Sequence, residues 1–523
     1  MDKSQKACNS RHVRGFLIVD KHGKTIHGVI DGGANTEKQS IVRAPLIEAM
    51  EAYHALDMAP YHTPGHKHGV TVHPSLRTML TEKGLRMDVS LMSALDDLND
   101  PEGCLLEAEQ MAASLYGAED AFFAVNGTTG AIHAMILATV RAGDKIIVPR
   151  TAHRSVIGGI ILADAMPVWV RPEVDEALGL AHGTAPEAYL SAIEAHPDAK
   201  AVFVVNPTYY GVCGDIKKIV RLAHEHGMAV LVDEAHGPHL VFADDLPMSA
   251  MEAGADLAAQ STHKLLPAMT QASLLLRQGE LVSRERVLQM LQLTQSTSPN
   301  YILMASIDGA RALMEEQGRP LMERTLRLAR RLREEVNKID GLFSFGRERI
   351  GTCGIYDLDE TKVTVTVSGL GVTGAQAEAV LRRKGIEAEL CDYHNVLFLI
   401  TVGDTDASID RLLAAIREMA DELRTGAVLD DIACDEIGLP EVVTSPRQAL
   451  YAEREKIDFA FSAERIAAEV VTFYPPGIPV LCPGERITTE AIDYCQRRID
   501  AGLFVSGPMD RSLRTILVEK ERD

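Results

Sequence analysis

The sequence predicts an α/β fold, with a mostly parallel, doubly wound sheet in a large domain and smaller α+β domains toward the C-terminus. Between about residues 91 and 276, short runs of β-branched residues alternate with amphipathic helical patterns. Alternation of this kind is typical of parallel sheets that carry helices on both faces. A chain of 523 residues with 46% hydrophobic content can also bury the large core that this fold requires.

Six apolar runs are expected as strands of this sheet. They are residues 121–125, 145–148, 168–170, 201–205, 228–232 and 273–276. Segments such as 107–115 and 216–226 have the apolar spacing of helices and separate most of the strands. Because ligands of doubly wound sheets bind beyond the carboxyl ends of the strands, the residues that follow each run are the candidates for a site.

Five segments are expected along the chain. They are an N-terminal extension at 1–44, an N-terminal arm with a helix at 45–90, the large domain at 91–310, linking helices with a small α+β domain at 311–425, and a C-terminal domain at 426–523. The Arg-, Glu- and Leu-rich stretch 303–339 is expected to form long helices between the domains. The proline-rich run 474–485 is expected to be a packed loop.

Composition limits the classes of partner and compartment. The 53 basic and 74 acidic residues give a net charge of −21, which disfavours nucleic acid and anionic membranes as partners and is compatible with a cationic substrate. The eight cysteines show no paired CxxC spacing, so neither a metal site nor a disulfide framework is expected. No apolar run approaches the length of a membrane span. The cytoplasm is the expected location.

Two residues near expected strand ends carry the chemistry. Asp233 closes the run 228–232, and Lys264 follows the weakly apolar residues 256–260. A lysine amine can form a Schiff base with the aldehyde of pyridoxal 5′-phosphate (PLP), and a buried aspartate can keep the pyridine nitrogen protonated so that the ring accepts electrons. Taken singly, Lys264 reads as a solvated lysine and Asp233 as a helix N-cap.

Three neighbouring motifs strengthen this interpretation. The run Asn126-Gly-Thr-Thr-Gly130 joins a strand to a helix start, where free N–H groups and hydroxyls suit a phosphate. His153 follows the strand at 145–148 and could lie flat against a pyridine ring, while His236 could reach the ring or its phenolic oxygen. The alternative for the run 126–130 is an ordinary glycine turn, and the alternative for His153 is a histidine in a surface loop. Together with Lys264 and Asp233, the set predicts a PLP site.

The same motifs resemble those of a known family. Pro64-Gly-His66, Asn126-Gly-Thr-Thr-Gly130, His153-Arg-Ser155, Asp233-Glu-Ala-His-Gly237 and Ser261-Thr-His-Lys264 look like the major domain of the ornithine/lysine/arginine decarboxylases, which are PLP enzymes of the aspartate-aminotransferase fold. The resemblance covers roughly residues 45–500, and the segment 426–523 resembles the family's C-terminal decarboxylase domain. The short chain is similar to the compact subgroup that includes the Bacillus-type biosynthetic arginine decarboxylases. Residues 1–44 match nothing in the family pattern.

Roles for individual residues follow from the resemblance. It implies Lys264 as the Schiff-base lysine, Asp233 as the partner of the pyridine nitrogen and His153 as the ring-stacking residue. The remaining cofactor contacts that it implies are Gly127, Thr128, Thr129, His236, Ser261 and His263. Thr297 would reach the phosphate of a neighbouring subunit, so a homodimer, or an assembly of dimers, is expected.

The resemblance implies the decarboxylation of a basic amino acid. L-Arginine, giving agmatine for polyamine synthesis, is the leading substrate, and lysine or ornithine is the alternative. Glu389 and Asp392, beside the expected strand at 396–402, are guesses for the residues that bind the cationic side chain, although both could be plain surface carboxylates. An aminotransferase or lyase of the same fold, and a PLP-binding regulatory protein without turnover, remain alternatives.

Overall fold

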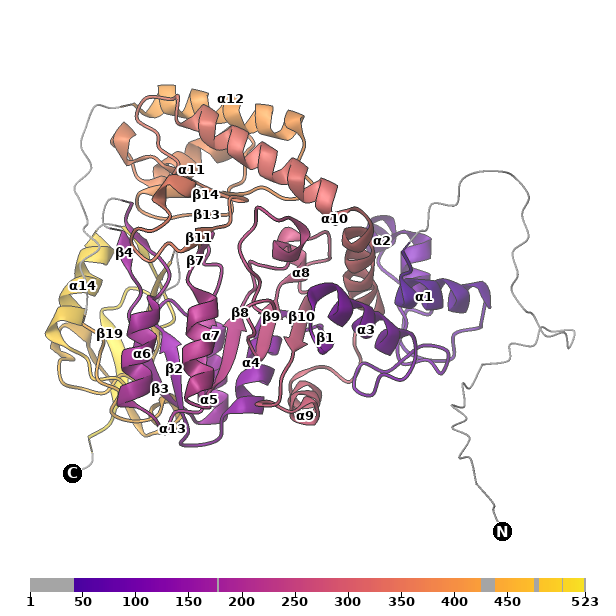
Figure 1. Cartoon of the computed structure of the whole chain (residues 1–523), viewed down its shortest axis with the longest axis horizontal. Coiled ribbons are helices and arrows are strands. Elements are labelled where there is room, and N and C mark those ends of the chain that lie inside the picture. The colour runs from indigo at the N-terminus through magenta and orange to yellow at the C-terminus, as the bar shows by residue number, and fades with distance from the viewer. Residues whose placement is uncertain (1–41, 176–177, 425–437, 475–478, 501, 522–523) are drawn as a thin grey trace, which may run out of the picture. The chain divides into compact units, whose positions relative to one another are not determined.

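The computed structural model describes residues 42–175, 178–424, 438–474, 479–500 and 502–521 (Figure 1). Most of the expected N-terminal extension and residues 475–478 of the proline-rich run therefore lie outside the described residues. Within the described ranges, no helix combines the length and the apolar character that crossing a bilayer requires.

A seven-stranded sheet forms the centre of the large domain. Its strands are β1 (Asp120–Ala124), β2 (Lys145–Pro149), β3 (Met166–Val170), β6 (Ala201–Val205), β8 (Ala229–Asp233), β9 (Leu257–Gln260) and β10 (Ser273–Arg277). They lie in the order β1-β10-β9-β8-β6-β2-β3, and only β10 runs antiparallel to its two neighbours. The expected α/β fold with a mostly parallel sheet is confirmed.

The sheet is buried on both faces, which explains why its strands are continuous apolar runs. All five residues of β8 are buried. Val230 and Val232 belong to the core on one face of the sheet, whereas Leu231 belongs to the core on the other. Side chains of a strand alternate between faces, so each face is filled by every second residue of the same run.

Helices cover the two faces as separate layers (Figure 1). One face carries α4 (Gly127–Thr139), α5 (Arg154–Ala163) and α9 (Arg284–Thr294). The other carries α3 (Cys104–Tyr116), α6 (Pro186–Ala195) and α7 (Ile216–Glu225). Beside the sheet edge that β1 forms, α1 (Pro45–Ala55) packs on α3 and on α10 (Tyr301–Val336), and α2 (Pro74–Met87) contacts α1. The chain therefore passes from strand to helix at one end of the sheet, and these turns supply the site.

A small α+β domain follows the large one. Its antiparallel sheet has the order β12-β14-β13, with β12 (Lys362–Thr366), β13 (Leu390–Cys391) and β14 (Asn395–Leu399), and it packs against α11 (Gly374–Arg383) and α12 (Asp406–Leu423). A single helix, α10 (Tyr301–Val336), runs across the expected boundary at 310/311. β11 (Asp357–Leu358) pairs with β7 (Val212–Cys213) of the large domain.

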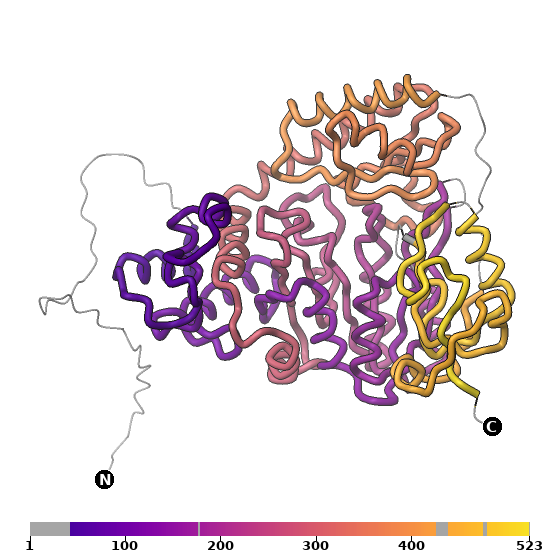
Figure 2. Tube along the Cα trace, turned by 180° about the vertical axis from the view of Figure 1, so that it is seen from behind, coloured from indigo at the N-terminus to yellow at the C-terminus, as the bar shows by residue number. Residues whose placement is uncertain are grey.

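The C-terminal segment has its own core and is anchored to the large domain (Figure 2). Its elements are α13 (Pro446–Tyr451), β15 (Arg454–Asp458), β16 (Val471–Tyr474), β17 (Pro479–Leu481), α14 (Thr489–Asp500), β18 (Phe504–Ser506) and β19 (Thr515–Glu519). Buried Arg150, directly after β2, forms a two-pronged ion pair with Glu485 at 2.5 and 2.8 Å. Its guanidinium also lies 4.7 Å from the ring centre of Trp169 and donates to the carbonyls of Pro479 and Val480.

A buried carboxyl group protects the free edge of β1. Glu109 of α3 accepts the outward N–H of Phe123 at 2.9 Å, so this N–H is not exposed at the sheet edge. Burial raises the pKa of Glu109 to about 8, although the Phe123 N–H and Arg284 favour the ionised form. The carboxyl group is therefore mostly protonated at neutral pH.

This group is expected to make the protein less stable at alkaline pH. An unfolded glutamate releases its proton near pH 4.5 and the folded one near pH 8, so stability falls as the pH rises between these values. Between pH 5 and pH 8 the unfolding free energy of the wild type should fall by about 3 kcal/mol because of this group, and the Glu109→Gln variant should not show this fall. Denaturant unfolding of both proteins at the two pH values measures it. Glu107→Gln, at an exposed site on the same helix, is the control. Parallel pH profiles for wild type and Glu109→Gln would contradict the assignment.

Candidate active site

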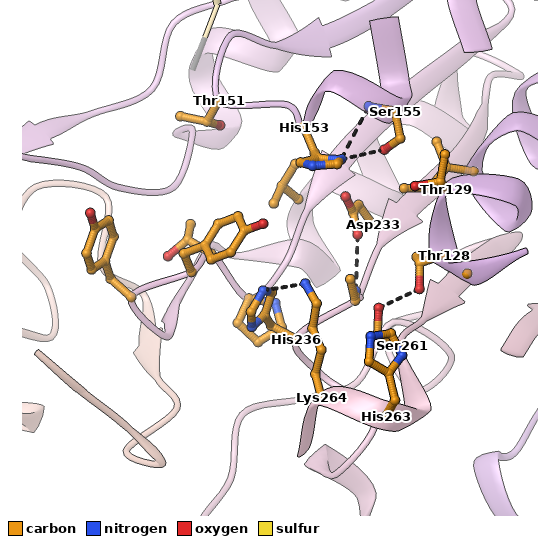
Figure 3. Close-up of a pocket in the computed structure, with 18 of the residues that line it drawn as sticks. Thr128, Thr129, Thr151, His153, Ser155, Asp233, His236, Ser261, His263 and Lys264 are labelled. Atoms are coloured by element: carbon orange, nitrogen blue, oxygen red, sulfur yellow. Dashed lines mark hydrogen bonds between the residues drawn. The ribbon is translucent and has the colours of Figure 1, made fainter. Parts of the chain in front are cut away.

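A cavity of about 330 Å³ opens at the carboxyl ends of the parallel strands, within the range of roughly 300–1,000 Å³ that is usual for small-molecule sites (Figure 3). Its walls come mainly from the segments that follow β1, β2, β6, β8 and β9, together with β5 (Leu180–Ala181). Nine residues nominated from the sequence line it. They are Gly127, Thr128, Thr129, His153, Asp233, His236, Ser261, His263 and Lys264.

Lys264 lies in the short helix α8 (Thr262–Leu265), immediately after β9. Its Nζ lies 2.8 Å from Nε2 of His236 and 5.1 Å from the ring centre of Tyr209. Burial lowers the pKa of Lys264, while the negative charges of Asp233 and Glu389 partly oppose this effect. A lowered pKa makes the neutral, nucleophilic amine more available than on an exposed lysine.

Asp233 ends β8, the strand beside β9, and its side chain is only 6% exposed. One carboxylate oxygen, Oδ1, accepts the N–H of Ala235 at 3.1 Å, and Oδ2 accepts no hydrogen bond from any described residue. Burial raises the pKa of Asp233, while His153 and Lys264 oppose this. A buried carboxylate with unused acceptor capacity is costly unless a cationic donor joins it.

His153 is the N-cap of α5 and is held by its own turn. Its Nδ1 accepts the backbone N–H of Ser155 at 3.3 Å and lies 2.8 Å from the Ser155 hydroxyl (Figure 3). With Nδ1 as the acceptor, the neutral ring carries its hydrogen on Nε2. Burial lowers the pKa of His153, and Asp233 partly opposes this, so the neutral ring is favoured. The turn thus fixes both the position and the tautomer of the imidazole.

A chain of hydroxyl groups lies at the start of α4. Ser273 donates to the carbonyl of Gln260 at 2.6 Å, so Thr128 must donate to Ser273, across 2.8 Å. Ser261 in turn lies 2.5 Å from Thr128 and supplies the hydrogen between them. Ser261 ends the chain, so its hydroxyl is the one that can turn toward a ligand. The first N–H groups of α4 also have no partners inside the helix.

Three nominated residues do not line the cavity. Thr297 is exposed in the loop between α9 and α10, and Glu389 is exposed at the start of the small-domain strand β13. Asp392 is buried, but its oxygens already accept hydrogen bonds from the Tyr210 hydroxyl at 2.7 Å and from the backbone and side chain of Asn395. Asp392 can therefore act on the cavity only through Tyr210.

Sequence reasoning missed several residues of the cavity wall. Tyr209 packs its ring 4.4 Å from that of His236, and Tyr210 and Thr208 lie beside it in the loop after β6. They follow an expected strand, and the run Asn206-Pro-Thr-Tyr-Tyr-Gly211 fits the family pattern, but neither signal gave these residues a role. Ser273 gave no signal, because it contributes through a hydroxyl chain that exists only in the folded protein.

The residues present fit a phosphorylated pyridine aldehyde. Asp233 offers an unused carboxylate oxygen where a protonated ring nitrogen is needed, and buried Lys264 offers an amine to the same cavity (Figure 3). The helix start at Gly127 suits a phosphate, since a Cβ built on this glycine would meet nothing within 4 Å. By contrast, no group of three or more His, Cys, Asp or Glu side chains in the described part of the chain is placed to hold a metal ion.

Comparison with known proteins agrees with this geometry. The sequence profile of the Orn/Lys/Arg decarboxylase major domain matches residues 44–408, and that of the Orn/Lys/Arg decarboxylase C-terminal domain matches residues 430–501. The arginine decarboxylase of Halalkalibacterium halodurans is 43% identical over 483 residues, which cover 92% of this chain and 98% of that protein. The arginine decarboxylase of Bacillus subtilis is 43% identical over 91% of this chain and 98% of its own length.

More distant relatives share the architecture. The lysine decarboxylase LdcA of Pseudomonas aeruginosa is 28% identical over 85% of this chain and 74% of its own length. Among solved structures, the lysine decarboxylase LdcF of Francisella novicida superposes with a TM-score of 0.79 at 22% identity, covering 92% of this chain and 81% of that one. The P. aeruginosa lysine decarboxylase A gives a TM-score of 0.77 at 25% identity, covering 91% and 80%. The chain belongs to the Orn/Lys/Arg decarboxylase family of PLP-dependent enzymes.

Proposed function

We propose that this protein is an arginine decarboxylase, which converts L-arginine into agmatine and carbon dioxide with PLP as cofactor and so supplies a polyamine precursor. The observation that carries the proposal is the placement of Lys264 and Asp233 in one cavity, at the ends of the adjacent parallel strands β9 and β8. The choice of arginine is supported by the relatives at 43% identity, which are arginine decarboxylases. Lysine is the second candidate, because lysine decarboxylases are also among the relatives. It ranks below arginine, since those relatives are only 28% and 25% identical to this chain.

The cofactor would be held by residues from four strand ends. Lys264 would attach to it covalently, Asp233 would accept the hydrogen of the pyridine nitrogen, and His153 would stack on the ring. His236, which lies against Lys264 Nζ, would flank the ring. The phosphate would be held by Gly127, Thr128, Thr129, Ser261 and His263, where the hydroxyls of Thr129 and Ser261 and the N–H groups at the start of α4 supply donors.

When bound, PLP supplies an electron sink for the electron pair that is released as the bond between Cα and the carboxylate breaks. Asp233 keeps a negative charge at its end of the cavity, which favours the protonated form of any base beside it. After carbon dioxide leaves, a proton must be added at Cα. Lys264 Nζ can deliver it, and His236 Nε2, 2.8 Å away, can hold Nζ in place.

Recognition of the guanidinium group is assigned to the small domain. Glu389 is the candidate for the ionic contact, because its negative charge is felt at Lys264 although its side chain is exposed. Asp392 would act indirectly, by fixing the Tyr210 hydroxyl that lines the cavity. Tyr209, whose ring faces the Lys264 amine, would cover the apolar part of the substrate side chain.

A homodimer is part of the proposal. Large apolar side chains are exposed in the N-terminal arm, where Tyr61 is 95%, Met79 is 75% and Val70 is 74% exposed. Covering such side chains with a second copy would remove them from water. In that dimer Thr297, which does not line the cavity of its own chain, would contact the phosphate in the partner's site. The cytoplasm is the proposed location, in keeping with six described cysteines that are all free of disulfides.

A substrate panel tests the function directly. The purified protein with PLP should release carbon dioxide from L-arginine and form agmatine faster than it forms cadaverine from lysine or putrescine from ornithine. Chromatography of the amines and carbon dioxide capture measure both products. Formation of a keto acid in place of carbon dioxide would identify an aminotransferase, and a preference for lysine would select the second candidate.

A further inference from the structure

A cluster of buried polar residues joins the small domain to the floor of the cavity. Asp359, Thr361 and Lys362 lie between β11 and the start of β12, and His239 comes from the loop that follows β8. The side chains of Asp359, Lys362 and His239 are fully buried. Nζ of Lys362 is hydrogen-bonded to the Asp359 carboxylate and donates to the backbone carbonyl of His236 at 2.6 Å.

The carboxylate of Asp359 is the centre of this cluster. Its Oδ2 lies 2.9 Å from Nε2 of His239, and its Oδ1 accepts the hydroxyl and the backbone N–H of Thr361 at 2.7 and 3.0 Å. Burial alone would raise the pKa of Asp359, but His239 and Lys362 hold it well below its ordinary range. The cluster is thus a compensated ion pair without access to water.

Two walls of the cavity contact the residues of this ion pair. The first is the loop after β8, because Lys362 holds the carbonyl of His236 while the imidazole of the same residue faces Lys264 Nζ at 2.8 Å. The second is the loop after β6, because Asp359 N–H donates to the carbonyl of Gly211 at 2.8 Å. A Cβ at Gly211 would meet the Asp359 carbonyl oxygen at 2.5 Å, so the two backbones are in direct contact.

Stability gives no sufficient reason for such a pair. A buried ion pair loses its hydration, and apolar residues of similar volume are often as stabilising or more so. What the pair supplies here is directional: an ammonium group that can donate to one specific carbonyl. That carbonyl belongs to the residue whose side chain contacts the proposed attachment lysine.

We propose that Lys362 and Asp359 are positioning residues that hold His236 against Lys264. The proposal rests on the proposed function, because it gives Lys264 the role of the attachment lysine. Lys362 provides the hydrogen bond to the His236 backbone, and Asp359 provides the negative charge that keeps the Lys362 ammonium in a buried place. His239 and Thr361 occupy the other sides of Asp359 and fix its orientation.

The test removes the pair without leaving an unbalanced buried charge. Lys362→Met alone would strand the Asp359 carboxylate, so the informative protein is the double variant Lys362→Met/Asp359→Asn, which is neutral and close in volume. Its matched control is Arg311→Met/Asp308→Asn, which removes another fully buried ion pair, on α10, that does not line the cavity. Circular dichroism and thermal unfolding establish that each full-length variant is folded.

Two readouts apply to the full chain stripped of cofactor. The first is the pH dependence of acetic anhydride labelling at Lys264, read by peptide mass spectrometry, which reports the pKa of its amine. The second is the dissociation constant for added PLP. In the Lys362→Met/Asp359→Asn variant, Lys264 should label about tenfold more slowly at pH 8, since looser packing of His236 would reduce the burial that lowers the pKa of its amine.

PLP affinity should fall about tenfold in the same variant, whereas the Arg311→Met/Asp308→Asn control should match wild type in both readouts. A folded variant with wild-type labelling and wild-type affinity would overturn the positioning role. Equal changes in the control would overturn it too, because they would reflect general loosening. If wild type takes up no PLP at Lys264, the proposed function fails, and the labelling profiles alone still decide whether Lys362 and Asp359 govern the amine.

Discussion

Replacing Lys264 with alanine is expected to abolish decarboxylation while the fold is kept. The side chain supplies both the covalent attachment and the proton for Cα in the proposed reaction, so the rate should fall by roughly 1,000-fold or more. Its amine is buried, and its pKa is lowered mainly by that burial, so losing it removes an unfavourable charge from the interior. Thermal stability of the cofactor-free protein should therefore be equal to that of wild type or higher.

The measurement combines turnover with trapping. Borohydride reduction of the wild-type protein with PLP should fix the cofactor on the peptide that contains Lys264, and Lys264→Ala should yield no labelled peptide. Lys218→Ala, at an exposed lysine paired with Glu187, is the control and should behave as wild type. Substantial residual decarboxylation by Lys264→Ala, or trapping on another lysine, would contradict the assignment.

Asp233→Asn is expected to lower the rate of decarboxylation and to raise the thermal stability of the cofactor-free protein. An amide cannot supply the negative charge that a protonated pyridine nitrogen requires, so the rate should fall by roughly 100-fold or more. In the cofactor-free protein, however, burial raises the pKa of Asp233, which means that ionising it costs stability above its ordinary pKa of 3.8. The cofactor-free variant should therefore melt at a higher temperature than wild type at pH 7, and this gain should shrink as the pH falls toward 3.8.

Thermal unfolding at two pH values and turnover at one pH check both halves of this expectation. Glu234→Gln is a closely matched control, because Glu234 is the next residue, is also buried, and accepts hydrogen bonds from the Ala250 N–H and the Gln260 amide away from the cavity. It should retain activity within a few-fold of wild type. If Asp233→Asn stayed active, or if Glu234→Gln lost as much activity, Asp233 would have no special place beside the cofactor.

Much of the fold could be predicted because both faces of the sheet are buried. A strand such as β8 must then be apolar at every position, and that signature is local. The strand β9 is not among the six expected runs and is indicated only by the weakly apolar stretch before Lys264, since Leu-Ala-Ala-Gln has no β-branched residue. It is a strand because it lies between β8 and β10, where its small side chains allow α4 to pack closely. The antiparallel direction of β10 likewise depends on the path of the chain and not on local composition.

The site was predictable to the extent that it lies at strand ends. Lys264, Asp233 and His153 each follow or close a strand, and a parallel sheet brings such positions together. The burial of Asp392 under Tyr210 could not be foreseen, because the two residues are far apart in sequence and their contact depends on how the small domain packs. Thr297 has no contact with the cavity of its own chain, so its expected role stays a prediction about a second copy.

The ion pair between Arg150 and Glu485 joins the turn after β2 to the C-terminal domain. The guanidinium lies three residues before His153, whereas its counter-charge lies 335 residues further along the chain. The C-terminal domain supplies Arg150 with the Glu485 carboxylate and with the carbonyls of Pro479 and Val480. The turn that carries His153 is thus tied to the C-terminal domain through Arg150, so a change that loosens this domain is expected to disturb that wall of the cavity.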